Sequence, residues 1–388
     1  MKTMLCLLLS LLMLLGCTGC MWMEGHYESI RPHQVGYSRD EGDTDLIGSY
    51  SELRAAVTAL VDAGTEEAVF TLYDYPEEEL RRDMESLIRY IREIYPVGAW
   101  AVSEMDYEYG QFLLSVRISY RRSRTDIDRI YTVRGINGAK EAINRALAAC
   151  ESSLVLQITG YLDTDFAQYV EDYAGLNPQT VMELPQVTAQ CYPQSGTVRI
   201  VEFQFTYQTS RESLRQMQTQ VRPVFSSARL YVSSDADDGV KLGQLYSFLM
   251  ERFDYTVQTS ITPSYSLLLH GVGDSRAFAQ VYAAMCRQTG LEAMTVSGTR
   301  NGESRFWNIV RNGDTWYHVD LLECARQGYY RELADWQMGE YVWDYSAYPV
   351  CGVDQTEETV PEETQIPETT APEPSTAPET ATEPDSAQ

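Results

Sequence analysis

The residues of this sequence that could do nucleophilic or acid–base chemistry gather in its last third. Ser275 stands where a predicted helix, running from about Ala277 to Gln288, begins. His318 and Asp320 are two positions apart on a predicted strand and therefore share one face of it. If His318 reaches Ser275, the imidazole can accept the hydroxyl proton while Asp320 orients the ring. One interpretation is therefore a serine-dependent peptidase, amidase or acyltransferase.

Metal and cofactor sites have little support in the sequence. It contains only four histidines, His26, His33, His270 and His318, and no two of them have the spacing of a zinc motif. There is no glycine-rich phosphate loop and no dinucleotide-binding fingerprint. We therefore expect neither a metal nor a cofactor.

The order of motifs in this region resembles the transglutaminase-like superfamily, a branch of the papain-like cysteine enzymes. The matching stretches are Gly290-Leu291 through Gly298, Trp307-Asn308, and Trp316 to Asp320. The resemblance covers roughly residues 225–353 and implies a papain-like α+β domain. It also implies that the catalytic Cys, His and Asp of the family fall on Ser275, Arg305 and Asp320.

Two of these three positions depart from the family pattern. The family chemistry needs a thiolate at a helix N-terminus, and the hydroxyl of Ser275 is much harder to ionise. Arg305 cannot serve as a base because a guanidinium stays protonated. We expect instead that Asp274 or Ser275 caps the helix and that Arg305 forms a salt bridge with Asp320. The sequence thus favours a pseudoenzyme over an enzyme.

A protein of this kind is expected to bind or to scaffold. The inherited cleft around Ser275, Arg305 and Asp320 retains one positive group, which would suit a carboxylate or a peptide C-terminus. The expected binding residues are Trp307, Asn308 and Trp316. The expected partner is a peptide or glycan of the cell envelope.

A hairpin and one helix must position these residues. The helix ends at Gly290, a typical C-terminal stop. Strands are predicted near Met294 and from Arg305 to Val310, and Asn312-Gly313 predicts the turn to a returning strand.

Two similar segments precede this domain, at residues 50–134 and 135–222. Val69 aligns with Val155 at an offset of 86 residues, and Tyr120 aligns with Tyr207 at an offset of 87. Each segment alternates helical and strand patterns. We predict two repeated αβαβ-type modules followed by the transglutaminase-like domain at 223–353, so the fold class is α+β.

Both ends of the chain differ from this middle part. Residues 1–16 read as a lipoprotein signal peptide, because an apolar run from Leu5 to Leu15 follows Lys2 and precedes a lipobox-like Cys17. Lipid on Cys17 would anchor the protein outside the cytoplasmic membrane, with 17–49 as a linker. Residues 354–388 contain ten acids, six prolines and no Lys or Arg, which predicts a disordered tail.

Composition excludes some classes of partner. The 388 residues carry 30 basic and 56 acidic side chains, a net charge of −26, which argues against nucleic-acid binding. Eight cysteines are too few for a disulfide scaffold. Two pairings stay open, Cys150 with Cys191 and Cys324 with Cys351.

Overall fold

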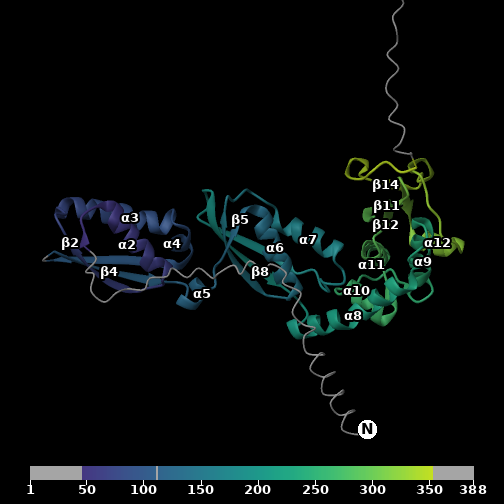
Figure 1. Cartoon of the computed structure of the whole chain (residues 1–388), viewed down its shortest axis with the longest axis horizontal. Helices are drawn as coiled ribbons and strands as arrows, with labels where there is room; N and C mark the ends of the chain where they lie inside the picture. Colours follow the sequence, from purple (N-terminus) through teal and green to yellow (C-terminus); the bar gives the residue numbers. More distant parts are fainter. Residues whose placement is uncertain (1–45, 111, 353–388) are drawn as a thin grey trace, which may run out of the picture.

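The computed structural model of the chain describes residues 46–110 and 112–352. They form two small α+β units, called the first and second unit, and a larger third domain (Figure 1). The expected signal peptide at 1–16, the lipidation site Cys17, most of the 17–49 linker and the 354–388 tail lie outside the described residues. Among the described residues, no helix is long and apolar enough to cross a bilayer.

The first unit packs helices on one face of a four-stranded sheet. Its strands lie in the order β1-β2-β4-β3, with β1 parallel to β2 and the other pairs antiparallel. The strands are β1 (Leu46–Ile47), β2 (Glu67–Leu72), β3 (Val102–Gly110) and β4 (Leu113–Tyr120). The helices are α2 (Tyr50–Asp62), α3 (Glu77–Glu93), α4 (Pro96–Ala101) and α5 (Arg124–Asp128).

The second unit has the same strand order and the same pairing directions, as β5-β6-β8-β7. Val69 pairs with Ser115 in the first sheet, and Val155 pairs with Glu202 in the second. The strands are β5 (Tyr131–Arg134), β6 (Ser153–Thr159), β7 (Gln186–Tyr192) and β8 (Val198–Thr206). The helices are α6 (Gly135–Ala148) and α7 (Phe166–Leu176).

Hydrophobic periodicity explains why these helices form and which way they face. In α3, Leu80, Met84, Leu87 and Ile91 recur every three or four residues, and all four are buried. They pack with the inward side chains of β2 and β4 in one core. The face predicted from the sequence is therefore the face that the structure buries.

The two units are joined through the open face of the second sheet. Ile200 of β8 is fully buried and belongs to the core of the first unit. The indole N–H of Trp100, in α4, donates to Glu202 at 3.2 Å, and Arg122 pairs with the same carboxylate at 2.6 Å. The joint therefore combines apolar contact with charge-assisted hydrogen bonds.

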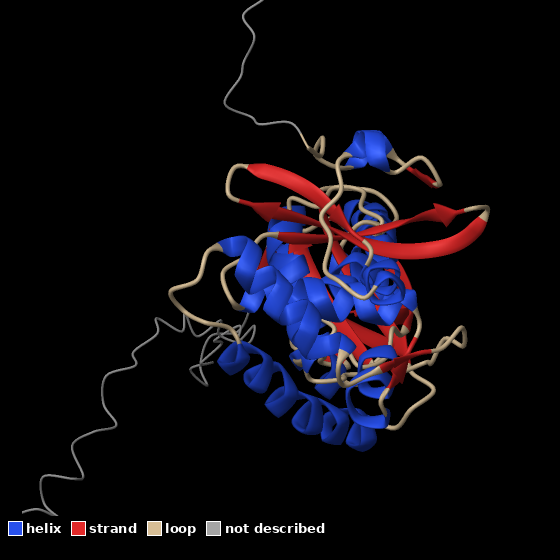
Figure 2. Cartoon of the chain, turned by 90° about the vertical axis from the view of Figure 1, so that its right-hand side faces the viewer, coloured by secondary structure: helices blue, strands red, loops and turns tan. Residues whose placement is uncertain are grey.

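The third domain packs helices against an antiparallel sheet of order β13-β12-β11-β14 (Figure 2). Its helices are α8 (Arg211–Tyr231), α9 (Asp238–Met250), α10 (Pro263–His270), α11 (Ser275–Gln288) and α12 (Leu321–Gln327). Its main strands are β11 (Ala293–Arg300), β12 (Glu303–Asn312), β13 (Thr315–Val319) and β14 (Tyr341–Trp343). Short elements complete it: β9 (Asp254–Tyr255), β10 (Val272–Gly273), η1 (Asp335–Gln337) and η2 (Tyr345–Ala347).

Element boundaries shift three of the expected domain limits. The expected start of the third domain at 223 falls inside α8, whose buried Leu214 and Val221 continue one apolar face with Phe225. β1 begins at Leu46 and pairs with β2, so the first unit starts before residue 50. β5 ends at Arg134 yet pairs with β6, so it belongs to the second unit.

Candidate functional site

Ser275 is the first residue of α11, and Asp274 caps that helix. The Asp274 carboxylate accepts the backbone N–H of Ala277 at 2.8 Å and the hydroxyl of Thr259 at 2.5 Å. The Ser275 hydroxyl oxygen accepts the backbone N–H of Phe306 at 3.3 Å. The prediction of a helix cap here is confirmed, with Asp274 as the capping residue.

Arg305 and Asp320 form the predicted salt bridge, and it is bidentate. Arg305 Nε lies 2.8 Å from Asp320 Oδ2, and Nη2 lies 2.7 Å from Oδ1. Their side chains are 15% and 2% exposed. A paired, nearly buried guanidinium cannot accept a proton, and its two engaged nitrogens are not offered to a carboxylate ligand.

Asp320 lies just beyond the strand on which it was expected. β13 ends at Val319, and Asp320 is the N-cap of α12, where its Oδ1 accepts the backbone N–H groups of Leu322 and Glu323 at 3.1 Å each. The hydroxyl of Tyr341 donates to Oδ2 at 2.9 Å. Burial and this carboxylate both raise the pKa of Tyr341, so Tyr341 acts as a donor.

His318 does not reach Ser275, and the structure contradicts the interpretation of His318 as a base for that hydroxyl. Asn308 of β12 points to α11, where its amide donates to Ala279 O at 2.8 Å. Trp307, the neighbouring residue, points to the opposite face of the sheet and donates its indole N–H to His318 Nδ1 at 3.0 Å. The sheet therefore separates His318 from the start of α11.

The hydrogen bonds of His318 fix its tautomer. Trp307 can only donate, so Nδ1 is unprotonated and Nε2–H donates to Asp335 Oδ1 at 2.8 Å. The ring is fully buried, and this burial lowers the pKa of His318 although Asp335 opposes the effect. His318 is thus a neutral link between the strands and the 3₁₀ helix at Asp335.

His318, Asp335 and Cys351 bring three potential metal-ligand atoms within 4.8 Å of one another. Nε2 would have to lose its proton to bind a metal, which would leave both ring nitrogens deprotonated while Trp307 still donates to Nδ1. Burial raises the pKa of the Cys351 thiol to about 12. The geometry therefore fits a hydrogen-bond chain better than a metal centre, and the absence of a metal stays a prediction.

The three expected binding residues are buried in the structure. Trp307 and Asn308 are 0% exposed and Trp316 is 9% exposed. Trp307 packs edge-on against Trp343 and Tyr341. Asn308 also donates to Met294 O at 3.1 Å and so ties α11 to the sheet. These side chains hold the domain together and present no surface to a ligand.

The inherited cleft itself is closed. Ser275, Phe306 and Asp320 border a space too small to admit a water molecule, with Phe278 and Leu321 filling its sides. A substrate carbonyl group would therefore find no space next to the Ser275 hydroxyl.

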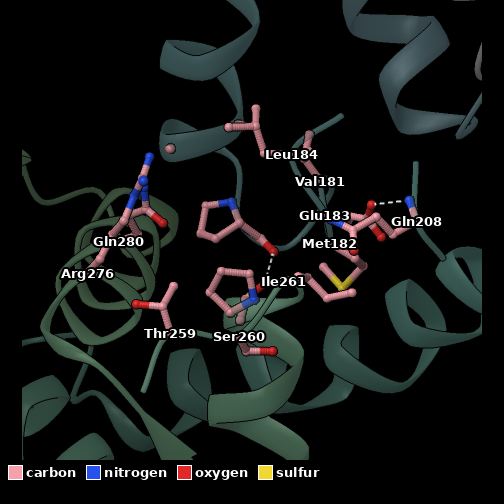
Figure 3. A pocket seen from close by; sticks show the side chains of 15 residues that line it. Val181, Met182, Glu183, Leu184, Gln208, Thr259, Ser260, Ile261, Arg276 and Gln280 are labelled. Atoms are coloured by element: carbon pink, nitrogen blue, oxygen red, sulfur yellow. Dashed lines mark hydrogen bonds between the residues drawn. The ribbon is translucent and has the colours of Figure 1, made fainter. Parts of the chain in front are cut away.

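An open pocket lies nearby, between the second unit and the first turns of α11 (Figure 3). Its volume is about 200 Å³. Arg276 and Gln280 border it from α11, and Leu184, Met182 and Glu183 border it from the second unit (Figure 3). Its other lining residues are Ala174, Gly175, Pro178, Val181, Gln208, Thr259, Ser260, Ile261, Pro263 and Ser264.

Sequence reasoning missed this pocket. Its walls are separated by about a hundred positions in the chain, and none of them belongs to a motif. Leu184 is 43% and Ile261 is 52% exposed, but this exposure is a property of the fold, and the sequence carries no local signal for it.

The cysteines that the structure describes are all free, so neither of the two considered disulfides forms. Cys324 lies in the core around α11, whereas Cys351 lies in the core around Trp307 on the other side of the sheet. Cys150 contacts Gln218 and Cys191 contacts Tyr161. The members of each pair therefore have different neighbours.

The comparison with protein-family models agrees with the motif pattern. The family model of the transglutaminase-like superfamily matches residues 227–321. No curated protein matches the chain. A solved TGase shows 10% identity and a TM-score of 0.25, covering 44% of this chain and 50% of that chain. A candidate cysteine protease from Cytophaga hutchinsonii shows 13% identity and a TM-score of 0.25, covering 43% of this chain and 69% of that chain. This chain spans half the length of the TGase.

Proposed function

The chain carries a transglutaminase-like superfamily domain at residues 227–321, and from this premise we propose that the protein binds or scaffolds at the cell envelope without catalysing acyl transfer. The bidentate pair of Arg305 with Asp320 is the observation that supports this most directly. It occupies the two positions at which the family pattern has its base and its orienting carboxylate.

The surroundings of Ser275 support the same conclusion. A helix N-terminus stabilises an anion by about 1 kcal/mol, which is far too little to ionise an alcohol at neutral pH. A serine nucleophile needs a base within hydrogen-bond reach. Within the described part of the chain, the Ser275 hydroxyl oxygen accepts a hydrogen bond from the backbone N–H of Phe306. This N–H group is a donor and cannot act as a base.

The sequence supports the proposed location and partners. We place the protein outside the cytoplasmic membrane, anchored by lipid on Cys17, with no nucleic-acid partner because of its net charge of −26. A peptide or glycan of the envelope is the proposed ligand class. The two α+β units, with equal strand order and matching registers, are proposed to be copies of one module.

A serine-directed fluorophosphonate probe tests the loss of catalysis. We expect the purified protein to be labelled no more than its Ser275→Ala variant and to hydrolyse neither nitrophenyl esters nor anilides above that variant. Ser297→Ala is the matched control, because Ser297 is an exposed serine on β11 of the same domain.

Labelling that disappears in Ser275→Ala but persists in Ser297→Ala would show that the proposal is wrong. The serine-dependent peptidase, amidase or acyltransferase would then be the better description. His318 could still not be its base, because both of its ring nitrogens are engaged.

A further inference from the structure

The pocket between the second unit and α11 has the properties of a binding site rather than of a packing defect. One wall comes from the end of α7 and the loop after it, and the other from the loop at 259–261, the start of α10 and α11. The residues of the second unit lie outside the family-matched range 227–321. Its apolar surface is wholly aliphatic: Pro178, Val181, Met182, Leu184, Ile261 and Pro263.

Hydrogen bonds and ion pairs across the boundary hold the two walls at a fixed distance. The buried Ser264 hydroxyl donates to Pro178 O at 2.7 Å, and Arg287 donates to Leu176 O at 2.6 Å. Arg276 pairs with Glu171 at 3.1 Å. Met182 is itself part of the core of the third domain. A pocket with such a frame exists before its ligand arrives, which lowers the entropic cost of binding.

Gln280 supplies a free amide to this aliphatic surface. Its side chain is half-buried and hydrogen-bonds to none of the residues that the structure describes. The backbone of α7 comes close to it at Gly175, where an added Cβ would stand 3.1 Å from Gln280 Nε2. An amide so placed can give one hydrogen bond and accept another, which is the pattern that a peptide bond presents.

The charges around the pocket are already satisfied. Arg276 is paired with Glu171, and the buried Glu183 carboxylate accepts the backbone N–H groups of Gln208 and Thr209 at 2.5 and 3.0 Å. The pocket therefore has no unpaired cation for a phosphate. None of its fifteen lining residues is aromatic, so it offers no ring on which a sugar or a base could stack.

The volume of the pocket limits the size of the ligand that it can hold. This volume is about 200 Å³. This is below the range of about 300–1,000 Å³ that drug-sized ligands fill. One branched aliphatic side chain with a flanking peptide bond fits such a space.

We propose that this pocket binds a peptide segment through one aliphatic side chain, with the Gln280 amide hydrogen-bonded to the adjacent peptide bond. The inference rests on the proposed binding role and narrows its ligand class from a peptide or glycan to a peptide. No bond is made or broken in the complex, and Ser275 takes no part in it.

Methyl NMR of the full chain with ¹³C-labelled methionine tests the proposal, because Met182 lines the pocket. The probes are N-acetyl-leucinamide, N-acetyl-serinamide and N-acetylglucosamine. We expect the leucine probe to shift the Met182 methyl signal with a dissociation constant on the order of 1 mM, while the other two leave it in place. The measurement is made on Ser275→Ala protein, so hydrolysis cannot disturb it.

Two variants with matched controls locate the contact. Gln280→Ala should weaken binding of the leucine probe about tenfold, because two hydrogen bonds are lost. Gln288→Ala, at the exposed end of the same helix, should not change it. Ile261→Ala should weaken binding, whereas Val257→Ala, exposed nearby in the chain but outside the pocket, should not.

An unmoved Met182 signal, or equal shifts with the serine and leucine probes, would overturn the proposal. So would a shift caused by N-acetylglucosamine alone, or equal affinities of Gln280→Ala and Gln288→Ala. Turnover that depends on Ser275 would overturn the proposed function instead, and it would be measured separately on protein that retains the serine.

Discussion

Asp320 has more hydrogen-bond partners than any other side chain near the inherited cleft. Its two oxygens accept from Arg305, from the Tyr341 hydroxyl and from two backbone N–H groups at the start of α12. A carboxylate that orients an imidazole in a triad needs one of these bonds. Here the same group joins a strand, a helix and β14.

Arg305→Ala is expected to lower the free energy of unfolding of the third domain by about 3 kcal/mol, because it leaves a buried carboxylate without its counter-ion. Tryptophan fluorescence in a urea titration measures it, since four of the five tryptophans among the described residues lie in this domain. Arg311→Ala is the control: it removes a surface pair with Glu292 and should cost at most about 1 kcal/mol. Equal losses in both variants would contradict the structural role of Arg305.

His318 should make stability depend on pH. Burial lowers its pKa below the ordinary value of 6.5, so the unfolded chain binds the proton more tightly than the folded chain. The contribution is present above about pH 6.5 and is lost as the pH falls below it. Between about pH 7.5 and pH 5.5 we expect the free energy of unfolding of the native protein to fall more than that of His318→Gln, measured by urea unfolding. Parallel losses would contradict this.

Single residues could be predicted where a local rule sufficed. The Arg305–Asp320 pair followed from the positions that the family resemblance implies, and the cap at Asp274 followed from the residue types that favour helix starts. The hydrogen-bond partners of His318 could not be predicted in this way. Asp320, which was expected to orient its ring, caps α12 instead. The ring accepts the indole N–H of Trp307 on the other face of the sheet.

At the scale of elements, β11 and β14 approach each other unusually closely at Gly298. An added Cβ there would stand 2.3 Å from Val342 O and 2.7 Å from the ring of Trp307. Gly298, the last residue of the family-like stretch that begins at Gly290, is therefore needed for packing. The hairpin at Asn312-Gly313 and the helix expected at 277–288 were also predicted correctly, because their turn and capping residues are local signals.

Gly298→Ala is expected to destabilise the third domain by about 2 kcal/mol, since backbone and a packed indole must both move. The thermal midpoint followed by near-ultraviolet circular dichroism measures this. Gly339→Ala is the matched control, because an added Cβ there meets nothing within 4 Å. A Gly298 variant as stable as the Gly339 variant would show that β14 can move away at little cost.

At the scale of the whole molecule, the joint between the two α+β units depends on one carboxylate. Glu202 accepts both the Trp100 indole and the Arg122 guanidinium, which also lies 5.2 Å from the Trp100 ring. Such joints, like the peptide pocket, connect residues about a hundred positions apart. The sequence contains no local rule for them, so they could not be predicted.

Glu202→Ala is expected to cost about 2 kcal/mol at this joint, because two donors lose their acceptor. Hydrogen exchange should rise at α4 and β8 but not at α11. Glu151→Ala removes a more exposed pair with Arg211 and serves as the control. Unchanged exchange at α4 in Glu202→Ala would show that apolar contact at Ile200 suffices.

Glu104 and Gln186 hold equivalent places in the two α+β units, because they pair with Ser119 and Thr206, which are 87 residues apart. The residue four positions before each of them contacts the next part of the chain. It is Trp100 in the first unit, inserted against the second, and Met182 in the second, inserted into the third domain. If the units are copies, each copy brought its own connector with it. A chain that grows by tandem duplication would then gain, with each copy, the side chain that connects that copy to the next unit.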